Sequence, residues 1–159
     1  AYDAKNFYVA ADVADASGPL NEKTGGDIWN GDAIEITLGL DPASDPSRSI
    51  FSASDFQIGL SPGDGKANPP AAWSFTRGGP IEGAAIFAGK SKRGWILKAR
   101  IPWSNFGAFA PKPGATIGFD FALDDQAEGG KGRSKQTPWN GDSSFYQNPS
   151  VWGTVKFLP

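Results

Sequence analysis

The sequence contains no cysteine, histidine or methionine. These absences exclude disulfide bonds, a zinc site built from Cys and His, a Ser-His-Asp triad, a cysteine nucleophile and a haem held by His or Met. Glutamate is scarce, with only four residues in the chain of 159. The enzyme chemistries that remain rest mostly on carboxylates or lysine.

Two further absences concern partners. Lys and Arg total 15 against 17 Asp and Glu, so the net charge is −2, without the positive excess of a nucleic-acid binder. No stretch approaches the roughly 18 consecutive apolar residues of a membrane-spanning helix. We therefore expect neither nucleic acid nor a membrane as a partner.

Turn-forming and aromatic residues are abundant instead. The chain holds 21 Gly and 13 Pro, and aromatics make up 13% of it, including six Trp. This composition is typical of many short strands joined by tight turns. The length is that of a single domain, so residues 1–159 are expected to form one unit.

Polar and apolar residues alternate along several segments, which predicts strands because successive strand side chains point to opposite faces. The clear segments are 6–14, 32–40, 55–60, 94–101, 116–124 and 151–158, and weaker ones are 71–77, 83–89 and 133–137. In the segment 116–124, Phe121 is expected on the same apolar side as its neighbours Phe119 and Leu123. Only Pro102 to Phe106 resembles a helical turn. The expected fold is all-β, an antiparallel β-sandwich of immunoglobulin-like or jelly-roll-like type.

The polar sides of the strands carry few but distinctive residues: Glu35, Gln57, Lys98, Arg100 and Asp120. Small residues such as Gly59 and Ala122 stand between them and leave room for something to lie against the sheet. The alternative is a plain polar outer face that loops cover.

Two aromatic residues fall in loops. Trp29 follows a Gly-Gly-Asp stretch, and Tyr146 lies within 143–150. Flat rings stack on the C–H faces of sugars, while Glu, Gln and Arg can hydrogen-bond sugar hydroxyls, so the combination favours a saccharide site. Of the other tryptophans, we expect Trp95, Trp103 and Trp152 in the core, and the positions of Trp73 and Trp139 stay open.

Carboxylates allow two other interpretations. A glycosidase needs two carboxyls about 5–10 Å apart, and Glu35 with Asp32 or Asp55 is a candidate pair, although Asp at strand edges commonly caps loops. Calcium binds six to eight oxygens, many from carboxylates. Acidic pairs that suit calcium occur at Asp12 and Asp15, at Asp41 and Asp45, and at Asp124 and Asp125, but none follows the EF-hand pattern.

Six pieces of the chain, taken in order, resemble the family 9 carbohydrate-binding modules. They are Asn-Phe-Tyr-Val-Ala with Asp15, Trp29 with Gly-Asp-Ala-Ile-Glu-Ile, Asp-Phe-Gln, Gly-Trp-Ile-Leu-Lys-Ala-Arg-Ile-Pro-Trp, Ile-Gly-Phe-Asp-Phe-Ala-Leu-Asp-Asp and Asn-Pro-Ser-Val-Trp-Gly. The resemblance implies a β-sandwich, often with bound calcium, that is appended to a secreted polysaccharide-degrading enzyme. Family members usually have strands before Asn6, so either this chain lacks them or another segment takes their place.

The resemblance also implies roles for residues. Trp29 and Tyr146 match two rings that hold a sugar between them, and Glu35 and Gln57 match polar positions of the pocket. The sequence departs from the family at three places, where Gly59 replaces an Arg, Ala122 a Gln and Ser143 an Asn. These departures suggest an eroded lining, for which Arg100 on a neighbouring strand is the candidate to compensate.

The prediction is therefore a non-catalytic, monomeric carbohydrate-binding module of a larger secreted or cell-surface protein that acts on polysaccharides. Its partner would be a plant cell-wall-type polysaccharide or oligosaccharide, of the kind found in xylan or cellulose. The predicted sugar-binding residues are Trp29, Glu35, Gln57, Arg100, Ser143 and Tyr146. A structural calcium ion is expected on Asp15, Asp124 and Asp125.

Three alternatives stay open at this point. The first is a structural or adhesive domain whose sugar pocket has decayed, and the second is an unrecognised carboxylate glycosidase or lyase. The third is a haem-binding domain, because the fold also resembles the DOMON-type domains. Without His or Met, the haem iron would have to use Lys or Tyr.

Overall fold

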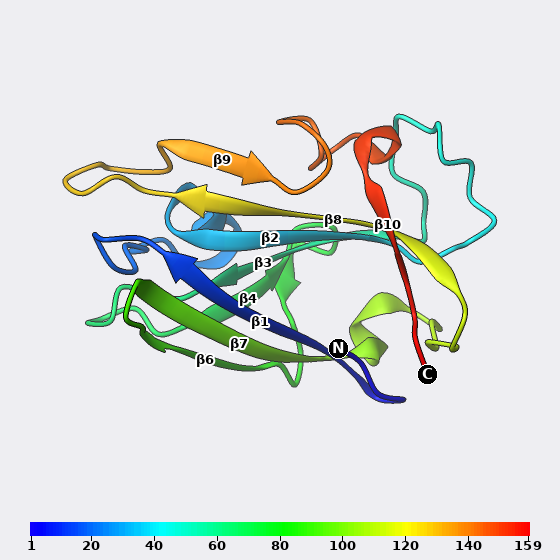
Figure 1. Ribbon diagram of the computed structural model, residues 1–159, viewed down its shortest axis with the longest axis horizontal. Coiled ribbons are helices and arrows are strands. Elements are labelled where there is room, and N and C mark those ends of the chain that lie inside the picture. The colour runs from blue at the N-terminus through cyan, green and yellow to red at the C-terminus, as the bar shows by residue number, and fades with distance from the viewer.

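Two antiparallel sheets face each other in the computed structural model, which describes residues 1–159 (Figure 1). The smaller sheet has the order β1-β7-β6, from Asn6–Ala14, Gly94–Pro102 and Ala85–Lys90. The larger sheet has the order β10-β8-β2-β3-β4-β5, with β9 also paired to β8. Its strands are β2 (Ala33–Gly39), β3 (Asp55–Ser61), β4 (Ala71–Ser74), β5 (Gly79–Pro80), β8 (Thr116–Asp125), β9 (Lys135–Pro138) and β10 (Gly153–Lys156). The predicted antiparallel β-sandwich is thereby confirmed.

Helical structure is confined to three 3-10 turns. The turn η2 (Trp103–Phe106) directly follows Pro102, as the sequence predicted. The turn η1 is Gly25–Asn30. The turn η3 (Pro149–Val151) lies where we expected the last strand to begin, because the Asn148 side chain accepts a hydrogen bond from the Ser150 N–H and favours a turn there. No helix of the structure has the length and apolar character needed to cross a membrane.

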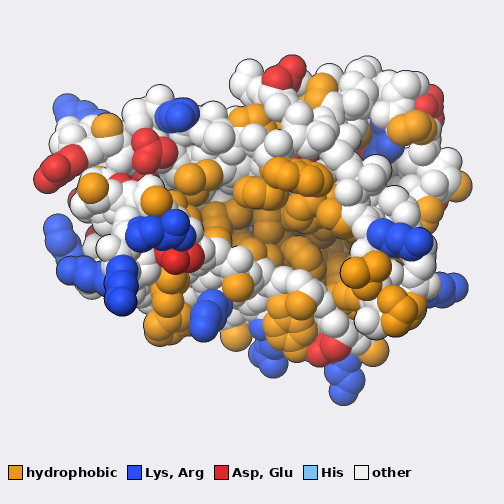
Figure 2. Space-filling view, viewed as in Figure 1, with side chains coloured by type: hydrophobic (Ala, Val, Ile, Leu, Met, Phe, Trp, Pro, Cys, Tyr) orange, Lys and Arg blue, Asp and Glu red, His pale blue; other side chains and the backbone are white.

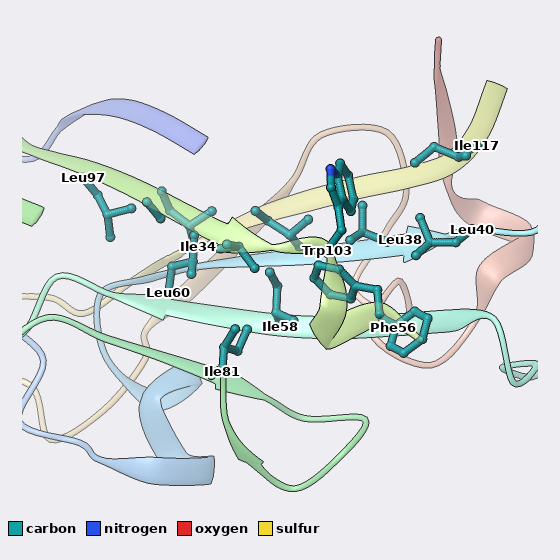
Figure 3. Packing of buried hydrophobic residues seen from close by; sticks show 14 of the residues in the cluster. Ile34, Leu38, Leu40, Phe56, Ile58, Leu60, Ile81, Leu97, Trp103 and Ile117 are labelled. Carbon is teal, nitrogen blue, oxygen red and sulfur yellow. The ribbon is translucent and has the colours of Figure 1, made fainter. Parts of the chain in front are cut away.

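The core lies between the sheets and follows from the alternation (Figure 3). Strand β2 contributes Ile34, Ile36 and Leu38 to the core. The neighbouring strand β3 adds its own alternate apolar side chains beside them. Trp103 of η2 packs among these residues at 4% exposure. Each fully buried side chain of this kind stabilises the fold by about 1.5–3 kcal/mol. The core also includes Phe56, Ile58, Leu60, Trp95, Leu97 and Ile101.

Seven strands cannot be fully covered by three, so part of the inner face of the larger sheet stays open. Figure 2 shows hydrophobic side chains uncovered in a hollow between the two layers. Phe121 of β8 is 38% exposed, and its ring stacks on the ring of Trp139 with the centroids 6.2 Å apart. Phe121 lies opposite Ile36 of β2, on the predicted apolar side with Phe119 and Leu123, but it is far more exposed there than Ile117.

The outer face of the larger sheet is covered at its centre. All seven residues of β2 and all seven of β3 are buried, although only alternate ones face the core. The residues on the other side must therefore lie under loops and turns, of which η1 contacts β2, β3 and β4. A strand buried on both faces yet carrying Glu35 and Gln57 places polar groups in a protected environment.

Candidate sugar-binding site

Glu35 lies at the centre of the covered face. The register pairs it with Gly59 of β3 on one side and with Ala122 of β8 on the other. Neither neighbour carries a side chain that could fill the space around the carboxylate, and yet Glu35 is only 3% exposed. The two larger polar neighbours lie on the diagonals, with Gln57 opposite Thr37 and Asp124 opposite Ala33.

The Glu35 carboxylate is bound on both oxygens by other side chains. Gln57 Nε2 donates to Oε2 at 2.5 Å. Arg133 Nη1 donates to Oε1 at 3.2 Å, and Gln136 Nε2 donates to the same atom at 3.0 Å. Because these donors occupy its lone pairs, Glu35 orients the amides of Gln57 and Gln136, whose oxygens face outward as free acceptors.

Asp124 joins the same network. Its Oδ1 accepts from Arg133 Nη1 at 2.8 Å and from Gln136 Nε2 at 2.9 Å. Burial and the neighbouring Glu35 carboxyl raise the pKa of Asp124 to about 8, and burial also raises the pKa of Glu35. Near neutral pH the two carboxyls therefore hold one proton between them. The single cation Arg133 then balances a single negative charge.

Three aromatic side chains rise around this polar floor. Trp29, Phe75 and Tyr146 line a cavity of about 340 Å³ together with Glu35, Gln57, Arg133 and Gln136. Trp29 is 37% exposed and Tyr146 is 46% exposed. The Arg133 guanidinium carbon lies 4.8 Å from the centroid of the Trp29 ring, so this cation links the floor to one wall.

Each exposed ring stands next to a buried anchor. Ile28 of η1 is fully buried, and the adjacent Trp29 is exposed. Phe145 is fully buried against Ala122 and Trp152, and the adjacent Tyr146 is turned outward. The loops thus hold both rings in place through neighbours that the hydrophobic effect fixes.

Phe75 occupies the space that Gly59 leaves free. A Cβ at Gly59 would lie 2.7 Å from Phe75 Cζ and 3.1 Å from Ile28 Cδ1. The backbone N–H of Phe75 donates to the Gln57 carbonyl at 3.0 Å, which fixes the residue just beyond β4. The glycine that looked like an eroded position in the sequence is therefore the seat of an aromatic ring.

Of the six predicted sugar-binding residues, the structure brings four to this one cavity: Trp29, Glu35, Gln57 and Tyr146. Their contact with a sugar stays a prediction. Arg100 was assigned wrongly, because it is exposed on β7 of the other sheet, paired with Tyr8 and Ala85. Ser143 was also assigned wrongly, since it is exposed and does not line the cavity.

Sequence reasoning missed Phe75, Arg133 and Gln136. Phe75 and Gln136 fall on strands predicted only weakly, and Arg133 lies just before β9 in a segment rich in glycine. The charge needed beside Glu35 comes from Arg133, which is 98 residues away in sequence. The only signal for Arg133 in the sequence was its place in the weakly predicted strand 133–137. That segment has no clear apolar alternation, so the sequence could not predict which face of the strand Arg133 occupies.

Neither aspartate proposed as a partner of Glu35 for glycoside hydrolysis lines the cavity that holds Glu35. Asp55 is bound by Arg48, whose Nη2 lies 2.5 Å from Asp55 Oδ1. Asp32 lies with other aspartates, outside the cavity that holds Glu35. The carboxyl that does adjoin Glu35 is Asp124, and both share the ligands Arg133 and Gln136. Such a contact pair does not flank a glycosidic bond from two sides.

A second cluster of carboxylates joins Asp15, Asp32 and Asp125, with one oxygen of each within 4.8 Å of the others. Two of the predicted metal residues, Asp15 and Asp125, meet here, and Asp32 was missed. Asp124 was assigned wrongly, because consecutive residues of a strand point to opposite faces, and its carboxyl belongs to the Glu35 network. Burial, with the charges of Asp15 and Asp125 adding to it, raises the pKa of Asp32 to about 6.

Comparison with known proteins agrees with the fold. The family described as "Carbohydrate family 9 binding domain-like" matches residues 1–158. The chain therefore belongs to the family 9 carbohydrate-binding domains, which are non-catalytic binding modules. None of the curated protein sequences matches this chain.

Solved structures show the same fold. A family 9 carbohydrate-binding module from Caldicellulosiruptor kristjanssonii in complex with cellotriose has a TM-score of 0.73 and 19% identity, over 99% of this chain and 71% of that one. A family 9 module from the same organism in complex with glucose gives 0.70 and 20%, over 98% and 72%. A putative carbohydrate-binding protein from Bacteroides uniformis gives 0.52 and 13%, over 96% and 71%.

Proposed function

We propose that the cavity between Trp29 and Tyr146 binds a pyranose of a plant cell-wall-type oligosaccharide or polysaccharide. The observation that carries this is the joining of three aromatic walls to a floor of four hydrogen-bonding side chains in one cavity. Stacking on the rings favours the C–H faces of the sugar, while Gln57, Gln136 and Arg133 offer directional partners for hydroxyls. The cellotriose and glucose bound to the Caldicellulosiruptor modules support a glucan-type ligand.

The same proposal includes a setting for the domain. A non-catalytic site on a chain of one domain is useful when it holds another activity near a polysaccharide. We therefore infer a monomeric module of a larger secreted or cell-surface polysaccharide-active protein. Copurification of the full-length parent protein with cellulose or xylan, compared with a parent that lacks this domain, tests this setting.

The test of the site is removal of one wall. Trp29→Ala should weaken binding of cello-oligosaccharides by about 1–3 kcal/mol in calorimetry, the usual cost of deleting an aromatic anchor. Trp139→Ala is the matched control, since Trp139 is 52% exposed and does not line the cavity. Equal affinities for the wild type and the Trp29 variant would remove the basis of the proposal.

A structural calcium ion on Asp15, Asp32 and Asp125 is the second part of the proposal. Three hard oxygen donors from separate segments converge, and Asp32 is only 1% exposed. Calcium prefers such ligands, and a bound cation would offset the repulsion among these carboxylates. The residues fit the ion, which would tie the segment after β1 and the segment before β2 to the end of β8.

The metal is tested by its effect on stability. Calcium at 100 times its dissociation constant should raise the free energy of unfolding by about 2.7 kcal/mol, and a chelator should reverse this. Asp15→Asn should abolish most of the effect, whereas Asp41→Asn, in an exposed loop at the other acidic pair, should not. A stabilising effect of calcium that survives in the Asp15 variant and is lost in the Asp41 variant would instead place the calcium site at the loop that holds Asp41.

A further inference from the structure

The smaller sheet has a free edge along β1. Its strand order is β1-β7-β6, so β1 pairs with β7 on one side only. In an antiparallel sheet, the backbone groups of alternate residues point to opposite neighbours. The N–H of Tyr8 points away from β7, and those of Ala10 and Asp12 therefore lie on the same side. Both of these residues are exposed, and no strand pairs with that side of them.

The first residues of the chain already occupy one end of this edge. The Ala1 amino group donates to the Tyr8 carbonyl at 3.1 Å, and the Tyr8 N–H donates to the Ala1 carbonyl at 2.8 Å. Tyr2 forms an antiparallel bridge with Phe7, and a turn over residues 3–6 joins the two sides. A strand that continued in this register would pass along the free edge of β1.

The inward side of this edge is apolar and only half covered. Val9 and Ala11 of β1 pack against the core but stay partly exposed, whereas the inward residues of β7 are buried. On the opposing sheet, Phe119 and Leu123 of β8 are partly exposed, and Phe121 is 38% exposed. In Figure 1, β1 lies between β7 and the strands β2 and β8, and Figure 2 shows hydrophobic side chains in a hollow in that part of the view. A strand beside β1 would cover apolar surface that the two sheets leave open.

We propose that the free edge of β1 is an attachment surface for one further antiparallel strand, formed by an extended segment joined directly before Ala1. The strand would pair with the free backbone groups of Ala10 and Asp12, the way sheet edges bind extended segments. Because Tyr2 faces the core, the first, third and fifth residues before Ala1 would face it too and be apolar. The domain would then be joined to the preceding polypeptide by a sheet ladder instead of a loose linker. This inference does not depend on sugar binding, since the cavity belongs to the larger sheet.

Two extensions of identical composition test the register. One adds Lys-Val-Lys-Val-Lys-Val directly before Ala1, which turns every valine toward the core, and the other adds Val-Lys-Val-Lys-Val-Lys, which turns every valine outward. Only the first should slow amide hydrogen exchange at Ala10 and Asp12, by about tenfold or more, and raise the urea concentration at the midpoint of unfolding. The amides of β6, the other edge of this sheet, are the internal control and should exchange at the same rate in both proteins.

A variant of the edge tests whether pairing with β1 is the cause. Ala10→Pro removes one N–H from the free edge, and an edge strand accepts proline on that side. In this background the first extension should lose its advantage over the second. Equal effects of the two extensions on the unchanged domain, or no effect of either, would overturn the inference. Should the Pro variant fail to fold, the comparison of the two extensions decides by itself.

Discussion

The outer faces of the two sheets look alike in sequence and differ in structure. Each face carries polar residues at alternate positions, Glu35 and Gln57 on one and Lys98 and Arg100 on the other. Glu35 is 3% exposed and bound by three side chains, whereas Lys98 and Arg100 are exposed. The difference is that turns and loops cover the larger sheet, and no loop covers β7. A polar position becomes part of a site only where other segments enclose it.

The largest expected effect comes from removing the cation of the covered face. Arg133→Met would leave Glu35 and Asp124 buried without their positive partner, and this should lower the free energy of unfolding by about 3 kcal/mol in urea denaturation. Arg100→Met, on the exposed face, should change it by less than about 0.5 kcal/mol. Similar losses of stability for the two variants would show that Arg133 does not stabilise the fold by compensating the buried carboxyls.

A smaller effect should follow from filling the space under Phe75. Gly59→Ala places a Cβ within 2.7 Å of the ring and should cost about 1–3 kcal/mol, because the ring must shift. It should also weaken sugar binding. Gly79→Ala on β5 meets nothing within 4 Å and serves as the control. A Gly59 variant as stable as the wild type would show that the ring moves freely.

The covered face should also make stability depend on pH. The pKa of Asp124 is raised to about 8 in the folded protein, above its ordinary value of 3.8, and the pKa of Glu35 is raised as well. Groups of this kind stabilise the fold fully below their unfolded pKa and lose that contribution as pH rises through the folded pKa. Stability should therefore decline between about pH 4 and pH 8. Asp32, with its pKa raised to about 6, adds a decline of the same sign.

Glu35→Gln isolates the part of this decline that belongs to the sugar cavity. The change removes one titrating group and the neighbouring carboxyl that raises the pKa of Asp124. Thermal unfolding measured from pH 4 to pH 8 should give a flatter profile for the variant than for the wild type. Parallel profiles would show that the carboxyl pair does not share a proton.

The smallest expected effects concern the residues that were assigned wrongly. Arg100→Ala and Ser143→Ala should each change the affinity for cello-oligosaccharides by less than about twofold, because neither side chain lines the cavity. A loss of tenfold or more in either variant would place the sugar outside the cavity described here.

The sequence alone determined the strands, their inward faces and the sandwich, because apolar and polar residues alternate along β1, β2, β3 and β7. It also indicated Trp29, Tyr146, Glu35 and Gln57, since exposed loop aromatics and a lone buried-strand glutamate are unusual residue types in those positions. It could not decide which polar faces join, so Arg100 took the place that belongs to Arg133. For the same reason the sequence predicted Asp124 as the third residue of the metal cluster, whereas the structure places Asp32 there.

Tertiary structure decided what depends on distant segments coming together. Arg133 meets Glu35 across 98 residues, and Phe75 fills the space of Gly59 through a turn beyond β4. Phe121 is exposed because a sheet of three strands cannot cover one of seven. Local alternation reports the face of a single strand, whereas enclosure, charge pairing and coverage are set by the packing of segments far apart in the chain.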